Sequence, residues 1–381
     1  MNKRIDIIDA LRGFSLLGIL IANMLYFQYD NVSLKAIQPD TWWDKAAYYF
    51  TKIFVEGSFI TIFGFLFGYS VILFVRSLEK RDYNIKGPVW RRAVGLILLG
   101  ILHTCFIWDG DILLMYGSGL LLFMLFIKRE VKTTLIWAGI LTIVTIPIFL
   151  VTTDVQNLFL TDSKVTIEIL KNGTYLDVVK RRMELLNDMG DASLLFVVIT
   201  LLIIFVFFVA ISFLAMGPFV LLGMAAAKVN FFKNIDGKVG LLKRISFLIP
   251  VGIVCKAFLQ SDFWIGKLLY GLGTYVVTIG YIALFSLLFI SMQQSKVFQA
   301  FMSLGRLSLT NYLMQSIICT TIFYGYGFGL FGKLGVALGL LIAAIIYSLQ
   351  LVLSNWYMQR FSTGPVEWTL RKFVYLRNGH Q

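Results

Sequence analysis

The chain has two histidines, and one of them, His103, lies deep within an apolar stretch. Residues 91–116 begin with two arginines, continue as mostly apolar sequence, break at Asp109-Gly110-Asp111 and become apolar again. An imidazole with two carboxylates within eight residues could move a proton, because an acid can orient the ring while the ring acts as a base. This spacing predicts a proton-handling site at the turn between two apolar segments.

Each member of this group also has a purely structural interpretation. His103 could be a hydrogen-bonded residue between helices, although an ionisable side chain inside a membrane is rare enough to favour catalysis or proton relay. Asp109 could be a polar residue of a wetted turn. Asp111 opens the next apolar segment, where a carboxylate suits a helix N-terminus, and it is the better partner for the imidazole. Glu56, at the start of another apolar run, is expected at a similar depth in the membrane.

A second candidate group lies near the start of the chain. Asp6, Asp9 and Arg12 recur at i, i+3 and i+6, which places them on one face of a helix. They could form an intrahelical ion-pair ladder, or Arg12 could hold an anionic substrate. Arg91 and Arg92 are expected on the same side of the membrane and could add to such a basic rim.

The segment 305–316, GRLSLTNYLMQS, is polar for a membrane span. Polar side chains out of water need partners, and hydrogen bonds between helices are the simplest source of them. Asn311 and Gln315, four residues apart, could equally line a polar cavity. The tail around Glu367, Trp368 and Arg371 is expected to be an amphipathic cap on the cytoplasmic membrane surface.

Composition identifies the elements that must position these residues. Of 381 residues, 58% are hydrophobic and 14% are charged, and the mean hydropathy is +0.80; a soluble domain carries about a quarter of charged residues. The net charge of +13 sits between apolar runs, where it orients helices, so we expect no nucleic-acid partner. Three scattered cysteines give neither a disulfide framework nor a metal site.

The fold class predicted is all-α, a polytopic transmembrane bundle. Ten apolar runs are long enough to span a membrane, and the distribution of Lys and Arg places both termini in the cytoplasm. We expect one transmembrane domain over 1–381, with five-helix halves at 1–152 and 193–381. Between them, the outer loop 153–192 should hold an amphipathic helix with Leu176, Val179, Met183 and Leu186 on its apolar face. The runs are 13–29, 50–75, 93–108, 112–127, 133–152, 193–227, 244–260, 268–290, 298–323 and 333–358.

Several segments resemble the YeiB-type family of bacterial membrane proteins, whose C-terminal half contains a domain of unknown function. That family is similar to a broader group of transmembrane acyltransferases that includes heparan-α-glucosaminide N-acetyltransferase. The resemblance implies a ten-helix core, a cytosolic acyl-CoA donor and an acceptor that is acylated at or beyond the opposite face. The matching segments are RIDIIDALRGFSLLGILIAN, EGSFITIFGFLFG, LHTCFIWDGDILLMYG, GRLSLTNYLMQS with FYGYGFGLFG, and GPVEWTLRKFVY.

The resemblance also implies roles for single residues. His103 would be the catalytic histidine, and Arg12 and Asn23 would line the path of the donor. In the related acyltransferase-3 branch, an arginine is followed after ten intervening residues by an essential histidine. Here Asn23 occupies that position after Arg12, so the catalytic imidazole would have moved to His103 on another helix.

Together with this resemblance, the sequence therefore predicts a plasma-membrane acyltransferase that takes an acyl group, expected to be acetyl, from acyl-CoA without a metal. His103 would be general base or acyl carrier, assisted by Asp111 with Asp109 or Glu56. Arg12, Asn23, Asp9, Asn311, Gln315, Arg91 and Arg92 would bind substrate. The acceptor could be a cell-envelope glycan, a lipid head group or a small metabolite.

Two other classes stay open. One is a proton-coupled transporter that uses His103, Glu56 and Asp111 as a relay. The other is a catalytically silent scaffold or lipid-binding protein. Membrane lipids are expected partners in every case, and Gly329, Gly332, Gly335 and Gly339 favour a homodimer because small residues allow close contact between helices.

Overall fold

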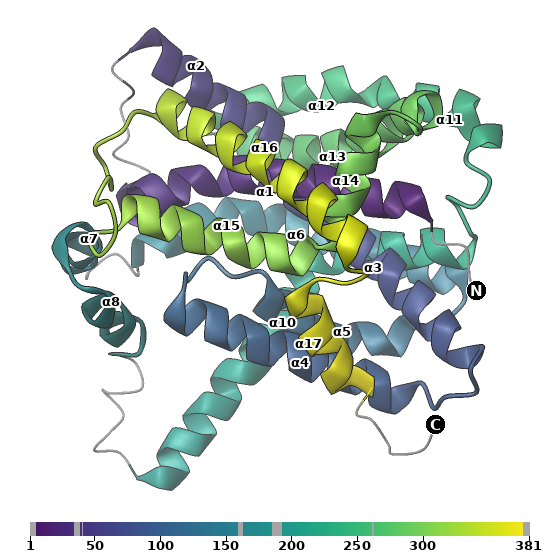
Figure 1. Ribbon diagram of the computed structural model, residues 1–381, viewed down its shortest axis with the longest axis horizontal. Coiled ribbons are helices and arrows are strands. Elements are labelled where there is room, and N and C mark those ends of the chain that lie inside the picture. The colour runs from purple at the N-terminus through teal and green to yellow at the C-terminus, as the bar shows by residue number, and fades with distance from the viewer. Residues whose placement is uncertain are drawn as a thin grey trace.

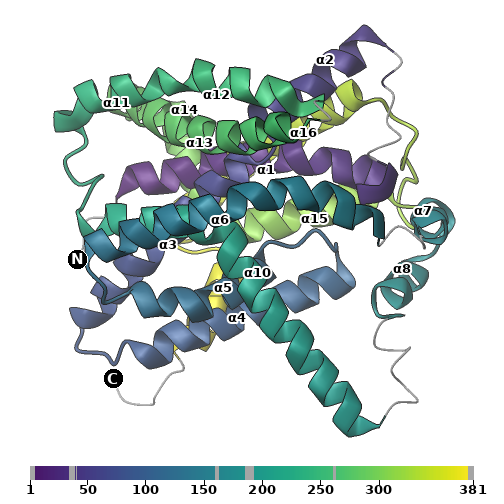
Figure 2. The same cartoon turned by 180° about the vertical axis from the view of Figure 1, so that it is seen from behind.

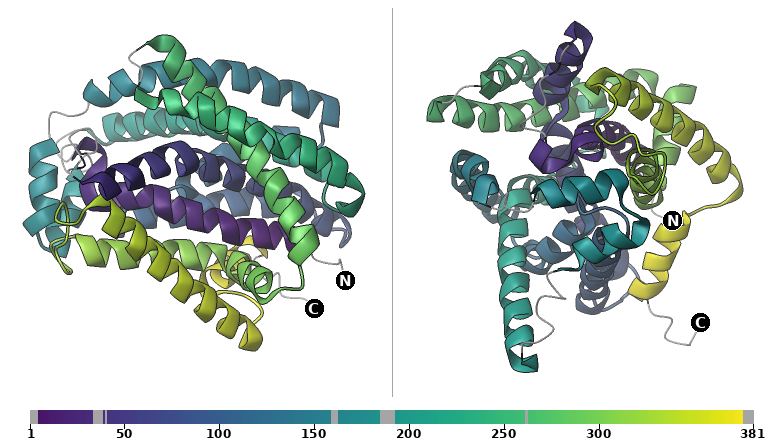
Figure 3. Two further views of the ribbon diagram at one scale, coloured as in Figure 1. Left: turned by 90° about the horizontal axis from the view of Figure 1, so that it is seen from above. Right: turned by 90° about the vertical axis from the view of Figure 1, so that its left-hand side faces the viewer.

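The computed structural model describes residues 5–33, 39, 41–158, 163–184, 193–260 and 263–375, and it is all-helical over these ranges. Most of the long helices run roughly along one axis of the molecule (Figure 1; Figure 3, left). The α-helices are α1 (Asp6–Ser33), α2 (Trp42–Phe50), α3 (Ser58–Glu79), α4 (Lys86–Phe106), α5 (Leu113–Phe123), α6 (Val131–Leu158), α7 (Ser163–Asn172), α8 (Tyr175–Arg182), α10 (Leu194–Lys228), α11 (Val239–Ser246), α12 (Leu248–Lys256), α13 (Trp264–Met292), α14 (Lys296–Arg306), α15 (Ser308–Phe323), α16 (Val336–Arg360) and α17 (Pro365–Tyr375).

The predicted all-α membrane architecture is confirmed. Among the described residues, six helices are long and apolar enough to cross a membrane, and 113–126 and 131–147 are shorter apolar helices. Two further predicted runs are each divided between two helices, because α11 and α12 share 244–260 and α14 and α15 share 298–323. The count of ten crossings stays a prediction.

Helix α1 lies in the middle of the bundle, and glycines let its neighbour α14 approach closely (Figure 1). A Cβ atom at Gly13 would collide with the carbonyl of Phe301, and one at Gly305 would collide with the carbonyl of Asp9. This contact brings the start of α1 against the end of α14. It therefore positions Arg12 beside Arg306, at the wall of the cavity described below.

Helix α10 is continuous through Gly217-Pro218, so the proline does not end it. Its C-terminal half is held against α3, because Gly68 and Gly223 allow backbone contact with Val220 and Phe65 respectively. Its N-terminal half projects away from the other helices (Figure 2; Figure 3, right) and exposes apolar side chains such as Phe207. A membrane solvates such a surface.

In the described part of 153–192, α6 continues to Leu158, and two short helices, α7 and α8, follow at one end of the molecule (Figure 2). Helix α8 begins with a capping box in which Thr174 and Asp177 satisfy each other's backbone N–H groups. Of the predicted apolar face, Val179 is buried and Leu176 is 64% exposed. Leu186 lies outside the described residues. That this face lies on the membrane surface stays a prediction.

Candidate functional site

The predicted pair of His103 and Asp111 is formed. Nδ1 of His103 lies 2.8 Å from Oδ1 of Asp111, and both side chains are almost completely buried. The second carboxylate oxygen accepts a hydrogen bond from the backbone N–H of Leu114, in the first turn of α5. Gly100 makes room for this arrangement, because a Cβ there would lie 2.7 Å from Oδ2 of Asp111. The turn between α4 and α5 thus fixes the carboxylate against the imidazole.

The other nitrogen of the ring, Nε2 of His103, is buried without a hydrogen-bond partner among the described residues. With an ionised Asp111, which can only accept a hydrogen bond, and a neutral ring, Nδ1 would donate to the carboxylate and Nε2 would keep a lone pair. The ring of Tyr312 lies 5.3 Å from the imidazole, and its hydroxyl accepts from the N–H of Ile112 and donates to the carbonyl of Gly110. Tyr312 therefore braces the turn that carries Asp111.

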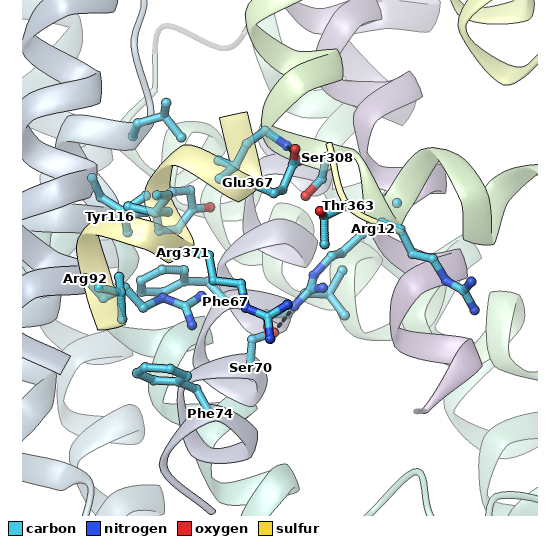
Figure 4. A pocket seen from close by; sticks show the side chains of 18 of the residues that line it. Arg12, Phe67, Ser70, Phe74, Arg92, Tyr116, Ser308, Thr363, Glu367 and Arg371 are labelled. Atoms are coloured by element: carbon cyan, nitrogen blue, oxygen red, sulfur yellow. Dashed lines mark hydrogen bonds between the residues drawn. The ribbon is translucent and has the colours of Figure 1, made fainter. Parts of the chain in front are cut away.

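A cavity of about 320 Å³ lies between α1, α3, α4, α5, α14, α15 and α17. Four arginines from four different helices line it, against one carboxylate, Glu367. Arg12, Arg92 and Arg371 reach into it from α1, α4 and α17 (Figure 4). The fourth arginine, Arg306, comes from α14. This excess of positive charge suits an anionic ligand.

Two of these arginines are held by other lining residues. Arg12 donates a hydrogen bond to the hydroxyl of Ser70 (Figure 4). The guanidinium of Arg92 lies 5.9 Å and 5.1 Å from the ring centroids of Phe67 and Phe74. Nε of Arg92 is buried without a hydrogen-bond partner among the described residues. Arg92 therefore keeps hydrogen-bonding capacity for a ligand.

The single carboxylate of the cavity is already stabilised. Glu367 of α17 accepts hydrogen bonds from the N–H groups of Leu309 and Thr310 and from the hydroxyl of Thr310. These groups form the N-terminus of α15, where the helix dipole favours a negative charge. The charge of Glu367 is thus directed to the N-terminus of α15.

The cavity and the His103–Asp111 pair share helices α4 and α5. Arg92, Leu96 and His103 recur at spacings of four and seven residues, so they share one face of α4. Leu96 lines the cavity, as do Leu113 and Tyr116 of α5, whereas His103 does not. The imidazole is 1% exposed and closed off in this state. Side chains of α4 and α5 would have to shift for a ligand to reach Nε2.

Asp9, predicted to bind substrate, is an ion-pair partner of the cavity arginines. Its carboxylate lies 3.3 Å from Nη1 of Arg12 and 3.5 Å from Nε of Arg306. The ion-pair alternative for this helix face is therefore present, and Arg12 also lines the cavity. That Arg12 holds an anionic substrate stays a prediction. Asp9 orients the arginines and does not line the cavity itself.

Glu56 does not lie beside His103, although its predicted depth in the membrane suggested that it would. Its carboxylate accepts from the hydroxyls of Tyr26 at 3.0 Å and Tyr270 at 3.4 Å and pairs with Lys52 at 2.8 Å. The ammonium of Lys256, which is fully buried, donates to the backbone carbonyl of Glu56 at 2.7 Å. These partners come from α1, from α12, from α13 and from the π-helical segment Thr51–Val55. We call these five residues the Glu56 cluster.

Asn311 and Gln315 join helices and do not line the cavity. Asn311 donates to Ser354 at 2.9 Å, and Gln315 donates to Gln350 at 2.8 Å. Gln350 donates in turn to the carbonyl of Asn311. Of the two alternatives, the structure contains the interhelical hydrogen bonds, which tie α15 to α16.

Three other candidate residues neither line the arginine-lined cavity nor contact the His103–Asp111 pair. Asp109 is exposed at the turn, and its neighbour Asp111 alone meets His103. Asn23 is half-buried on α1, about 16 Å along the helix axis from Arg12. Arg91 donates from Nε to the carbonyl of Val374, so it fastens α17 to α4. His380 lies outside the described residues.

Sequence reasoning missed Arg306 and Arg371 as cavity residues. Arg306 interrupts the apolar run 298–323, and an arginine inside a predicted span is itself a functional signal. Arg371 gave no such signal, because α17 resembles a surface helix until its packing on α4 is known. Among the described residues no three His, Cys, Asp or Glu side chains are grouped as metal ligands.

Comparison with known proteins adds a family. Residues 226–377 match a family described as a protein of unknown function (DUF418). The chain is 32% identical to the uncharacterized protein YxaH of Bacillus subtilis, over 98% of this chain and 95% of that protein. It is 26% identical to the uncharacterized protein YeiB of Escherichia coli, over 96% and 95%.

A third relative is an uncharacterized 39.9 kDa protein in the amylase 3' region of Bacillus acidopullulyticus, 27% identical over 99% of this chain and 95% of that protein. No solved structure matches.

Proposed function

The chain belongs to the YeiB-type family of membrane proteins, and within that family we propose that it is a membrane-embedded acyltransferase whose donor is an acyl-CoA. The observation that supports this is the adjacency, on α4 and α5, of an arginine-lined cavity and a buried histidine, one nitrogen of which has no partner among the described residues. The first feature suits the phosphates of a donor. The second suits proton transfer at the reacting group.

Donor binding would use the cavity arginines. Guanidinium groups bind phosphate oxygens with two parallel hydrogen bonds, and Arg12, Arg92 and Arg371 reach the same space (Figure 4). His103 lies about 16 Å farther along α4 than Arg92. The pantetheine arm would follow this helix face past Leu96 towards the imidazole, after the side chains of α4 and α5 have shifted.

The chemical step would be assisted by His103. Nε2 takes the proton of an acceptor hydroxyl or amine, the acceptor atom attacks the thioester carbonyl, and the C–S bond breaks. The CoA thiolate leaves and receives the proton from the imidazolium. Asp111 stabilises the imidazolium through Nδ1. In a covalent variant, Nε2 itself attacks the thioester carbonyl, the C–S bond breaks and the CoA thiolate leaves. The acceptor then takes the acyl group from Nε2, and its proton passes through the imidazole to the thiolate.

Topology completes the proposal. The cavity would open to the cytoplasm, where acyl-CoA is made, with both termini on that side and the chain in the plasma membrane. The distribution of Lys and Arg along the sequence supports this orientation. The acceptor, a component of the cell envelope or a small metabolite, would approach from the other side.

The test is transfer of a labelled acetyl group from acetyl-CoA by the purified protein. We expect the wild-type protein to release CoA and the His103→Ala variant to have lost this activity. The Asp109→Ala variant, at the exposed turn nearby, should retain it. Release of CoA at equal rates by wild type and His103→Ala would remove His103 from the reaction.

Proton-coupled transport is the alternative. A relay of His103, Asp111 and Glu56 would need a path to Glu56, whose hydrogen bonds go to Tyr26 and Tyr270. Substrate uptake by proteoliposomes under a pH gradient, with no requirement for CoA, would favour transport over acyl transfer.

A further inference from the structure

A second cavity, of about 250 Å³, lies between α6, α10, α11 and α13, and it differs in chemistry from the arginine-lined one. Every residue that lines it is apolar. No side chain there can donate or accept a hydrogen bond, so only a hydrocarbon group fits this lining. The lining residues are Phe65, Val131, Leu135, Leu222, Ala225, Ala226, Val229, Phe231, Leu242, Ile245, Ile279, Ile282 and Ala283.

The two chain segments that border this cavity are strongly basic. Residues 127–132 lead into α6, and residues 228–244 connect α10 to α11. They contain two acidic residues, Glu130 and Asp236, and the following eight basic ones: Lys128, Arg129, Lys132, Lys228, Lys233, Lys238, Lys243 and Arg244. The border of the apolar cavity is therefore net positive.

Lys228 joins the two segments. Its ammonium donates to the carbonyls of Phe126 at 2.6 Å and Arg129 at 2.5 Å and to the hydroxyl of Thr134 at 3.1 Å. These bonds hold the start of α6 against the end of α10. Val131 and Val229, each next to a basic residue in sequence, line the cavity between them.

Helix α11 also combines apolar residues that line the cavity with basic residues that are exposed, all within eight residues. Leu242 and Ile245 line the cavity, whereas Lys243 and Arg244 between them are exposed. A short helix with an apolar side and a basic side is typical of a membrane interface, where long basic side chains reach the head-group layer. The cavity thus lies under the interface and the basic residues lie at it.

We propose that this cavity is a lipid site that takes one acyl chain of an anionic phospholipid, with the phosphate on the basic border. The apolar lining accepts the chain, and the net positive border selects an anionic head group over a zwitterionic one. Basic pockets between membrane helices bind anionic head groups in this way. The site is separate from the arginine-lined cavity and independent of acyl transfer.

The experiment compares two lipids with identical chains, palmitoyl-oleoyl phosphatidylglycerol and palmitoyl-oleoyl phosphatidylcholine. Delipidated full-length protein is titrated with each, and bound lipid is counted by native mass spectrometry. We expect phosphatidylglycerol to bind more tightly. Lys243→Gln/Arg244→Gln should weaken its binding by about thirty-fold, the effect of two interfacial charges. The matched control Arg81→Gln/Lys86→Gln, also two exposed basic residues, should leave it unchanged.

A second variant tests the chain-binding part. Ala225→Phe fills the cavity and should reduce binding of both lipids, whereas Val206→Phe, on the exposed half of α10, should not. Equal affinity of wild type for the two lipids, or equal losses in both charge variants, would overturn the anionic site. Unchanged lipid binding by folded Ala225→Phe would overturn the cavity as its location.

Discussion

Two groups of ionisable side chains lie inside the apolar bundle, and they differ in whether their polar atoms are satisfied. In the Glu56 cluster, the carboxylate has three partners and the buried ammonium of Lys256 has two, the carbonyl of Glu56 and the hydroxyl of Ser58. In the His103–Asp111 pair, one nitrogen is buried with no partner among the described residues.

Under the proposed function, this difference would separate a structural group from a reactive one. A buried polar atom without a partner costs about 1–3 kcal/mol, and such a cost is commonly kept at functional sites. The Glu56 cluster has the opposite character, since its hydrogen bonds join α1, α12 and α13 where Thr51–Val55 forms a π-helical turn. We therefore expect the His103–Asp111 pair to control turnover and the Glu56 cluster to control stability.

The largest effect on turnover is expected from Asp111→Asn. An amide can donate to Nδ1 of His103, which would move the ring proton to Nε2 and remove the base. Acyl transfer should fall by about 10²–10⁴-fold, measured as CoA release. Asp109→Asn, two residues away and exposed, is the matched control. Similar losses in both would mean that the turn, and not the pair, is required.

A smaller loss is expected from Gly100→Ala. The added methyl group would collide with the backbone nitrogen of Leu114 and would lie 2.7 Å from Oδ2 of Asp111, so it would push the start of α5 and the carboxylate away from α4. A misplacement of about 1 Å costs about 10²-fold in rate. Gly139→Ala, whose Cβ would meet nothing within 4 Å, should keep full activity. An unchanged rate in Gly100→Ala would show that the distance from His103 to Asp111 does not matter.

Arg92→Gln should act on donor binding alone. Loss of one charge-assisted contact to a phosphate should raise the KM for acyl-CoA about tenfold and leave kcat unchanged. Arg81→Gln, exposed and outside the cavity, provides the comparison. A fall in kcat without a change in KM would assign Arg92 to the chemical step.

Lys256→Met should leave turnover unchanged and reduce stability. The variant leaves the buried carbonyl of Glu56 without its donor, which costs about 1–3 kcal/mol. Denaturant unfolding in detergent measures the loss, and the folded fraction is then assayed for acyl transfer. Loss of turnover without a change in stability would reverse the comparison between the two groups.

The sequence predicted what is local or repeated. Apolar runs of span length became helices, because a membrane leaves few other structures for the backbone. The contact between His103 and Asp111 was also predictable, since eight residues across a turn bring the two side chains together. Asn311 and Gln315 gave two alternatives, and the packing of α15 on α16 decided between them.

The lateral arrangement of the helices could not be predicted. Glu56 was placed near His103 because both were expected at one depth, but depth does not say which helices are neighbours. The hydrogen bonds of Glu56 to Tyr26 and Tyr270 depend on the packing of α1 and α13 around it. Arg371 likewise lines the cavity only because α17 folds back on α4.

The cavity wall made by α17 has a consequence for biosynthesis. Arg12 belongs to the first described helix, whereas Glu367 and Arg371 belong to the last described one. A nascent chain has His103 and Asp111 long before that wall exists. A chain cut short after α16 would still enter the membrane with this pair, but it would lack part of its anion-binding surface. Under the proposed function, the donor site would therefore be complete only after α17 has been synthesised.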